Sequence, residues 1–205
     1  MKAARATPYP FAYPETSHTR KHGPYGYKDY ESFRDWLRDE FSFRCVFCLT
    51  REQWGLARGA WDIDHFVAQS RDSTAILTYD NLLYLCSTCN ATKSSHLILD
   101  PGKVALGECL KVNDDGTITA LNEEGELLIE VLRLNNEDYT RFRSLILTTI
   151  RSLEKHNRGA FVLWMSYPDS LPNLKRLRPI GNSRPDGVKD SFFERRERGE
   201  LEDVY

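Results

Sequence analysis

The sequence predicts an α+β fold with an N-terminal helix, a small core of two strands and a helix, and a C-terminal helical extension. Two observations support this prediction. Two apolar segments of strand length, Trp61 to Val67 and Tyr79 to Leu85, are followed by a stretch from Ser87 that is expected to begin a helix. Two Cys-x-x-Cys pairs flank the segments, one before the first strand and one at the start of the helix. The expected order is therefore a cysteine pair, a strand, a loop, a second strand, the second cysteine pair and a helix.

The paired cysteines predict one structural zinc site. Four thiols in two close pairs are typical of tetrahedral zinc coordination in an intracellular protein. A site with four thiolates leaves no open position for substrate or water, so these residues stabilise the fold and do not catalyse. The zinc ligands are Cys45, Cys48, Cys86 and Cys89. The interval between the pairs is long for a plain zinc ribbon, and it is where chemistry is expected.

The composition and net charge of the chain argue against two classes of protein, nucleic-acid coats and membrane proteins. The chain has 205 residues, an apolar fraction ordinary for a soluble protein and a formal net charge of −2. A charge so near zero argues against a general nucleic-acid coat, which needs many cations to displace counterions. With no signal peptide and no apolar segment of membrane-spanning length, we expect a cytoplasmic protein without a membrane contact. Cys109 stands alone and is expected to pack in the core.

The first half of the chain is expected to contain an irregular segment and then the core. Residues 1–27 are rich in proline, tyrosine and histidine, and no regular element is predicted there. Residues 28–100 form the predicted zinc-bound core with a leading helix, which Asp29 caps, and a second short helix is expected from Thr50 to Gly59. The apolar stripe of the leading helix predicts packing against the core. Its members are Tyr30, Phe33, Leu37 and Phe41.

Residues 101–167 are predicted to form a hairpin and two helices. Asp115-Gly116 marks the hairpin turn, one helix covers about Glu123 to Leu134, and Asn136 caps the other. The apolar stripe of the second helix predicts core packing, and basic side chains occupy the other face and its flanks. A solvated face is the default for these side chains and contact with phosphates is the alternative. They are Arg133, Arg141, Arg143, Arg151, Lys155 and Arg158.

Residues 168–205 are predicted to form a tail. Proline and glycine interrupt this segment, and a run containing Phe192 and Phe193 follows. The tail either packs back onto the domain through these two rings or is offered to a partner.

The candidate chemistry lies between and just after the cysteine pairs. Hydrolysis of a phosphodiester needs a base for water and a cation that neutralises the developing charge. His65 is the candidate base, and Asp64 with an asparagine oxygen is suited to one hard cation such as Mg²⁺. Asp62 lies on the same side of an extended strand as Asp64, so spacing alone leaves both carboxylates as candidates. A buried hydrogen-bonded Asp-His pair without activity is the alternative interpretation.

The order Cys-x-x-Cys, Asp-His, Asn-Leu-Leu-x-Leu-Cys-x-x-Cys-Asn-x-x-Lys resembles the zinc-bound form of the HNH endonuclease family. The resemblance covers about residues 45–93 and implies a ββα-metal fold with catalytic Mg²⁺ or Mn²⁺. It implies that Asp64 is a metal ligand, His65 the general base, Asn81 the brace of the loop that carries the histidine, and Asn90 the second metal ligand. The departures from the family pattern are Ala68 in place of a frequent proline and the absence of glycines in the loop that follows.

Two basic residues of this region are the candidates for nucleic-acid contact, Lys93 and Arg71. Lys93 matches a family lysine one helical turn after Asn90, which contacts phosphate or supports the helix.

The resemblance implies a metal-dependent endonuclease that hydrolyses DNA and leaves 5′ phosphates. The region after the motif is also similar to the tail halves of HNH proteins in bacterial anti-phage systems, including the Septu-type nuclease subunit that pairs with an ATPase. This second resemblance makes a role in defence against foreign DNA, with an ATPase partner, a further expectation. The rival hypotheses are a zinc-stapled nucleic-acid- or protein-binding module without catalysis and a nuclease subunit active only with its partner.

Overall fold

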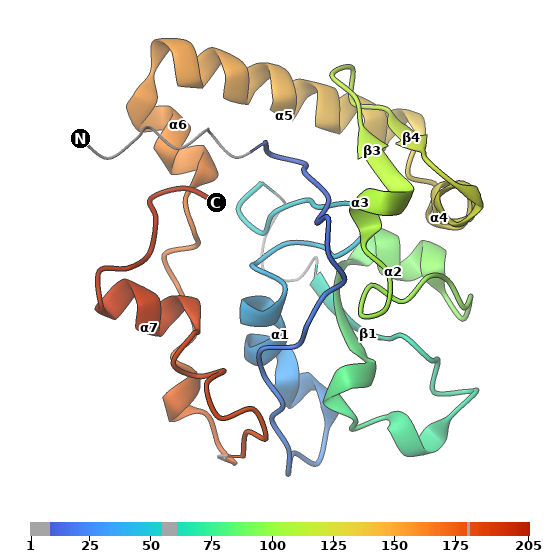
Figure 1. Ribbon diagram of the computed structural model, residues 1–205, viewed down its shortest axis with the longest axis vertical. Coiled ribbons are helices and arrows are strands. Elements are labelled where there is room, and N and C mark those ends of the chain that lie inside the picture. The colour runs from blue at the N-terminus through green and yellow to red at the C-terminus, as the bar shows by residue number, and fades with distance from the viewer. Residues whose placement is uncertain (1–8, 55–60, 180) are drawn as a thin grey trace.

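The computed structural model describes residues 9–54, 61–179 and 181–205. Its central unit is an antiparallel pair of strands, β1 (Trp61–His65) and β2 (Leu82–Cys86), followed directly by helix α2 (Ser87–Lys93). Asp64 pairs with Leu83, and His65 pairs with Leu82 at the end of the ladder. The predicted α+β class is confirmed, and the predicted order of strand, strand and helix is observed (Figure 1).

Both strands are shorter than the sequence predicts, and both lose residues at the end that joins the β1–β2 loop. The predicted first strand continues to Val67, but the side chain of Asn81 hydrogen-bonds the Val67 backbone and ends the ladder at His65. The predicted second strand begins at Tyr79, where the chain instead forms a single 3₁₀ turn, η3 (Tyr79–Asn81). Two further turns, η1 (Tyr30–Phe33) and η2 (Ser73–Ala75), lie before α1 and in the β1–β2 loop.

The leading helix packs its apolar face on this core. Asp29 accepts a hydrogen bond from the backbone N–H of Ser32 (2.9 Å), so it caps the helical segment as predicted, and α1 (Arg34–Glu40) follows η1. Phe33 and Leu37 of the predicted stripe are buried. The predicted helix from Thr50 to Gly59 lies partly outside the described residues, and residues 51–54 form a bridge and a turn.

The C-terminal extension begins with α3 (Leu106–Cys109) and the hairpin of β3 (Leu110–Val112) and β4 (Ile118–Ala120), and three helices follow. These helices are α4 (Glu123–Leu132), α5 (Glu137–His156) and α6 (Arg158–Met165). Figure 1 shows α5 across one end of the molecule, with the hairpin near one of its ends and α6 at the other. Asn136 caps α5 as predicted.

The sequence predicts two helices in this region, whereas the structure has three, because the chain turns at Asn157. The side-chain oxygen of Asn157 accepts a hydrogen bond from the backbone N–H of Ala160 (3.0 Å), which starts α6 directly after α5 ends.

Arg143 is the exception among the six basic residues predicted to be solvated or to contact phosphates, because the other five are exposed. Its side chain is 1 % exposed, and its Nε and Nη2 donate hydrogen bonds of 2.6 Å to the backbone carbonyls of Gly116 and Leu134. Gly116 sits at a φ of +88° against the α5 backbone, where a Cβ would lie 2.5 Å from the carbonyl oxygen of Thr140. The arginine is therefore a structural link between the hairpin turn and α5.

The tail packs back onto the domain, which decides between the two predicted alternatives. It contains η4 (Leu174–Arg176) and α7 (Phe192–Glu197), and Phe192 is buried against Phe43 and Leu171. The backbone N–H of Phe192 donates to Asp39 (2.8 Å) at the end of α1.

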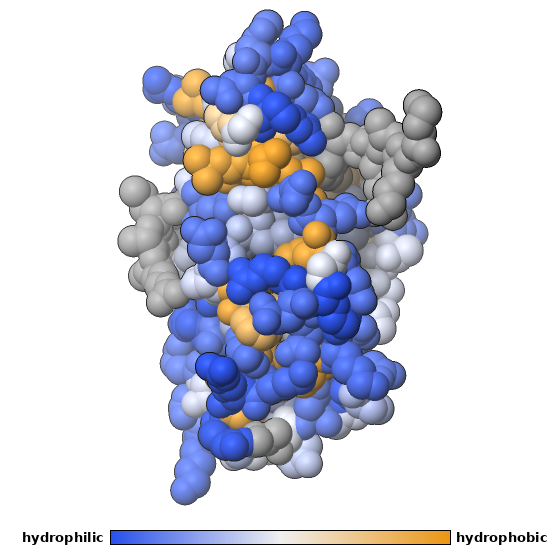
Figure 2. All heavy atoms as spheres, turned by 90° about the vertical axis from the view of Figure 1, so that its left-hand side faces the viewer, coloured by the Kyte–Doolittle hydropathy of each residue, from blue (hydrophilic) through white to orange (hydrophobic). Residues whose placement is uncertain are grey.

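The face that carries α6 and α7 is mostly hydrophilic, with apolar side chains in separate patches (Figure 2). None of the described helices combines the length and the apolar composition that crossing a bilayer requires.

Glu40, the last residue of α1, holds the N-terminal segment against the core. Its carboxylate accepts hydrogen bonds from His18 Nε2 (2.9 Å), the backbone N–H groups of Lys21 (2.9 Å) and His22 (3.0 Å), and the hydroxyl of Tyr79 (3.1 Å). Burial by itself raises the pKa of this carboxyl, but the hydrogen bonds and the nearby imidazoles outweigh burial and lower the pKa from 4.5 to about 2.

A dependence of stability on pH follows from this network. The stabilisation by ionised Glu40 is fully present above the unfolded pKa of 4.5 and is lost as the pH falls toward the folded value of about 2, because the unfolded chain takes up the proton first. We expect the free energy of unfolding, measured by urea denaturation, to fall through this window. The Glu40→Gln variant should show a shallower fall, and a slope unchanged by the substitution would contradict the assignment.

Candidate functional site

The four cysteines of the two pairs come together as one cluster. Their sulfur atoms all lie within 4.8 Å of one another, and Cys48 Sγ is 3.7 Å from Cys86 Sγ. The first pair lies in the loop after α1, where the backbone N–H of Val46 donates to the carbonyl of Tyr84 in β2 (3.2 Å). The second pair spans the end of β2 and the first turn of α2. The predicted grouping is confirmed, and the cluster is suited to a metal such as zinc.

The surroundings of the sulfurs fit a bound cation. Burial raises the pKa of the Cys45 thiol well above its ordinary value, and the neighbouring sulfurs raise it further. The cysteines can therefore all be ionised only with a positive charge between them, which a bound metal such as zinc would supply. The hydroxyl of Tyr139 in α5 lies 3.6 Å from Cys89 Sγ and 3.7 Å from Cys86 Sγ, and Thr50 Oγ1 lies 3.2 Å from Cys48 Sγ. The helical spacing of Tyr139 predicts only that it packs in the core and does not reveal this contact.

His65 is the last residue of β1, and its ring is held on three sides. Its Nε2 lies 3.0 Å from the carbonyl oxygen of Ile76, which can only accept a hydrogen bond, so Nε2 carries the proton. Nδ1 then holds the lone pair, and it lies 3.2 Å from Nε2 of Gln69. The ring of Tyr30 meets the imidazole edge-on, with centroids 4.9 Å apart. These three partners come from loops and a turn, and no spacing in the sequence identifies them.

Asn81 joins the two ends of the loop between β1 and β2. Its Oδ1 accepts a hydrogen bond from the backbone N–H of Val67 (2.8 Å), and its Nδ2 donates to the carbonyls of Val67 (3.1 Å) and Ala75 (3.3 Å). Ala75 precedes Ile76, whose carbonyl orients His65. Asn81 therefore lies where a residue that braces the loop is needed.

Replacing Asn81 with alanine removes all three of these hydrogen bonds. We expect a loss of about 2–4 kcal/mol in the free energy of unfolding, since each net hydrogen bond is worth about 1 kcal/mol and the freed backbone groups lose their partner. Asn81→Asp keeps the acceptor for Val67 N–H but turns a carboxylate oxygen toward the carbonyls of Val67 and Ala75, so it should be no more stable than the alanine variant. Urea denaturation of the three proteins measures this order, and an alanine variant as stable as the wild type would contradict the bracing role.

Two polar pairs connect β1 to α2. Asn90 Nδ2 donates to Asp62 Oδ2 (3.0 Å), and Lys93 Nζ forms an ion pair with Asp64 Oδ2 (2.7 Å) and donates to the carbonyl of His65 (3.1 Å). Asp62 and Asp64 share a face of the strand, and Asn90 and Lys93 share a face of the helix. The residues predicted from the sequence are thus neighbours, but Asn90 meets Asp62 and not Asp64.

The environments of the two carboxylates differ. Burial raises the pKa of Asp64, and the ion pair and hydrogen bond with Lys93 oppose that effect. Asp62 and Asn90 are only partly buried, and the Asn90 amide keeps its oxygen free of hydrogen bonds to the described residues. Carboxylate oxygens of Asp62 and Asp64 and the amide oxygen of Asn90 are the kinds of donor that Mg²⁺ prefers, so the chemistry of these side chains suits such an ion.

The two candidate nucleic-acid contacts lie in opposite environments. Lys93 is fully buried, and its ammonium is used by Asp64 and the backbone. Arg71 is exposed on the loop between β1 and η2, close in sequence to Gln69. Contact of these residues with nucleic acid stays a prediction.

No protein-family model matches the chain, and comparison with curated proteins finds no match.

Proposed function

We propose that the chain is a metal-dependent endonuclease of the HNH type that hydrolyses phosphodiester bonds in DNA. The observation that carries the proposal is the orientation of His65. The carbonyl of Ile76 fixes the proton on Nε2 and leaves the lone pair on Nδ1, next to the Gln69 amide, as a base.

In the proposed reaction, His65, the loop around it and the metal each have a separate role. His65 Nδ1 takes a proton from the attacking water, and this water takes the place that the Gln69 amide occupies at Nδ1. Asn81 and Ile76 keep the imidazole in position through the loop. The carboxylates of β1 with Asn90 would hold the Mg²⁺ or Mn²⁺ ion, which would supply positive charge against the negative charge that develops on the phosphate and on the departing 3′ oxygen.

The first experiment should decide which carboxylate, Asp62 or Asp64, holds the metal. The resemblance implies Asp64 with Asn90, whereas the contact with Asn90 favours Asp62, and Lys93 already neutralises Asp64. Asp62→Asn and Asp64→Asn remove one charge each and change little in volume. They form a matched pair of variants.

The test is incubation of the purified protein with supercoiled plasmid in Mg²⁺, Mn²⁺ or EDTA. We expect nicking or linearisation with either metal and none in EDTA. The Asp→Asn variant of the metal ligand should lose cleavage and weaken Mn²⁺ binding measured by calorimetry, while the other variant keeps Mn²⁺ binding. Absence of cleavage under every metal, with the fold and zinc intact, would contradict the proposal.

A second candidate is a zinc-stapled nucleic-acid-binding module without catalysis. The buried Asp64–Lys93 pair favours it, because an ion pair that crosslinks β1 and α2 is a structural use of a carboxylate. This candidate predicts binding of DNA in a mobility-shift assay that persists in EDTA and is unchanged in the His65→Ala variant.

A further inference from the structure

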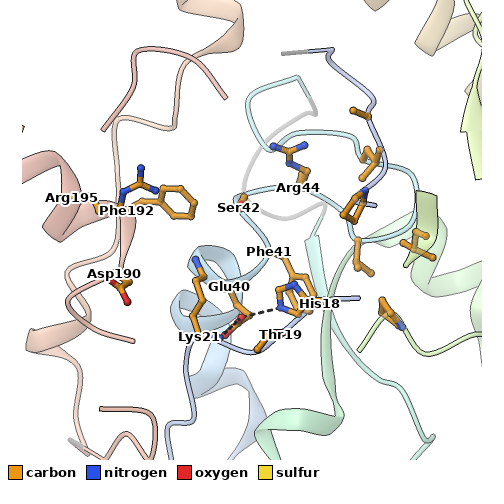
Figure 3. A pocket seen from close by; sticks show the side chains of 16 residues that line it. His18, Thr19, Lys21, Glu40, Phe41, Ser42, Arg44, Asp190, Phe192 and Arg195 are labelled. Atoms are coloured by element: carbon orange, nitrogen blue, oxygen red, sulfur yellow. Dashed lines mark hydrogen bonds and ion pairs between the residues drawn. The ribbon is translucent and has the colours of Figure 1, made fainter. Parts of the chain in front are cut away.

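A cavity of about 680 Å³ lies apart from the candidate nuclease residues. Three segments of the chain form most of its lining, namely the N-terminal segment near His18, the end of α1 with the loop of the first cysteine pair, and α7 with the residue Asp190 before it (Figure 3). Pro101 and Leu106 complete the lining. None of its lining residues belongs to β1, β2 or α2. Its volume is in the range of small-molecule sites, about 300–1,000 Å³.

Three cationic side chains line the cavity, one from each of the three segments: Lys21, Arg44 and Arg195. Arg44 is the least satisfied of them. Its Nε is buried without a hydrogen-bond partner. Its guanidinium carbon lies over the ring of Tyr205, 4.9 Å from the ring centroid. Arg195 is placed over the Phe192 ring, and among the described residues neither arginine forms an ion pair. Both side chains are only partly buried, so an anionic ligand that enters the cavity can reach them and supply the partner they lack.

The two carboxylates of the lining do not supply that partner. The carboxylate oxygens of Glu40 already accept hydrogen bonds from His18, from the backbone of the N-terminal segment and from a tyrosine hydroxyl. Asp190 is exposed, and Figure 3 shows its carboxylate pointing away from the Arg195 side chain. Lys21 is paired with Asp39 and contributes only part of its charge. The unpaired charge in the cavity therefore comes from the two arginines.

The remainder of the lining is largely apolar, with a few hydroxyl groups. The lining residues that carry a hydroxyl group are Ser42 and Thr19. The apolar wall is made by Ala12, Pro14, Phe41, Val46, Leu49 and Leu106. A ligand for this cavity thus has an anionic head and an organic body. A guanidinium group suits a phosphate, because its planar N–H groups bond two of the phosphate oxygens at once.

We propose that this cavity binds a phosphorylated small molecule of about mononucleotide size, with the phosphate at Arg44 and Arg195 and the organic body against the apolar wall. The site is independent of the proposed nuclease activity. A long polyanion is disfavoured, because Asp190 and Glu40 lie in the same lining and would repel its further phosphates.

The test is calorimetric titration of the full chain with AMP, GMP, CMP and UMP separately, beside inorganic phosphate and a 5′-phosphorylated oligonucleotide. We expect at least one mononucleotide to bind more tightly than inorganic phosphate. Arg195→Ala should weaken that binding by roughly tenfold or more, as expected for one lost charge-assisted contact. Arg196→Ala is the matched control, because this neighbour in α7 is exposed and donates to the carbonyl of Asp169 outside the cavity.

Arg44→Ala gives the second variant, with thermal melting as the check that it folds. An equal or larger loss of mononucleotide binding in a folded Arg44→Ala protein supports the proposal. Three results would each overturn it: no mononucleotide binds at millimolar concentration, binding is unchanged in Arg195→Ala, or the oligonucleotide alone binds.

Discussion

Replacing His65 with alanine is expected to lower the rate of DNA cleavage by about a hundredfold to ten-thousandfold, the usual cost of removing a general base. The reason lies in the tautomer of the ring. The Ile76 carbonyl takes the Nε2 proton, so the group that accepts a proton from water is Nδ1, and alanine has no replacement for it. The rate is measured as loss of supercoiled plasmid under single-turnover conditions in Mg²⁺.

The control for this variant is His96→Ala. His96 is an exposed histidine just beyond α2, and its Nδ1 lies 2.9 Å from the carbonyl of Lys93, away from the β1–β2 loop. We expect the control to retain cleavage. His65→Ala also removes the hydrogen bond to Ile76, so both variants need a melting curve that shows a folded protein. A folded His65→Ala protein with wild-type cleavage would refute the assignment of the base.

Replacing Cys86 with serine is expected to release the metal and to unfold much of the core. Structural zinc contributes on the order of 10–16 kcal/mol of apparent binding free energy in zinc-finger peptides, more than the total stability of most domains. The loss acts on several elements at once, because the cluster ties the loop after α1 to β2 and α2, and Tyr139 of α5 contacts two of its sulfurs. Zinc content measured by atomic spectrometry, together with thermal melting, reports both effects.

Cys109→Ser is the matched control. Cys109 is also buried, but it lies at the end of α3, outside the cluster, and its sulfur accepts a hydrogen bond from Asn122 Nδ2 (3.5 Å). We expect this variant to keep its zinc and to lose only a modest part of its stability. A Cys86→Ser protein that retained both zinc and the wild-type melting temperature would contradict the structural role of the cluster.

The sequence by itself determined the features that depend on neighbours along the chain. Asp29 and Asn136 cap helices because a cap needs only the backbone N–H groups a few residues later. Asp115-Gly116 forms the predicted hairpin turn for the same reason. The two cysteine pairs were predicted to meet because each spacing presents two sulfurs on one side of a tight turn, and one metal needs four.

Only the tertiary structure decided which side chains meet across elements. The spacing places Asp62 and Asp64 on one face of β1, but the alignment of α2 on the strand gives Asn90 to Asp62 and Lys93 to Asp64. Arg143 has the sequence pattern of a solvated residue, and it is buried because two carbonyls from other elements point at its place on α5. The cavity at Arg44 requires three segments that are far apart in sequence. A local pattern fixes the face on which a side chain lies, whereas its partner depends on how whole elements pack, which no short stretch of sequence specifies.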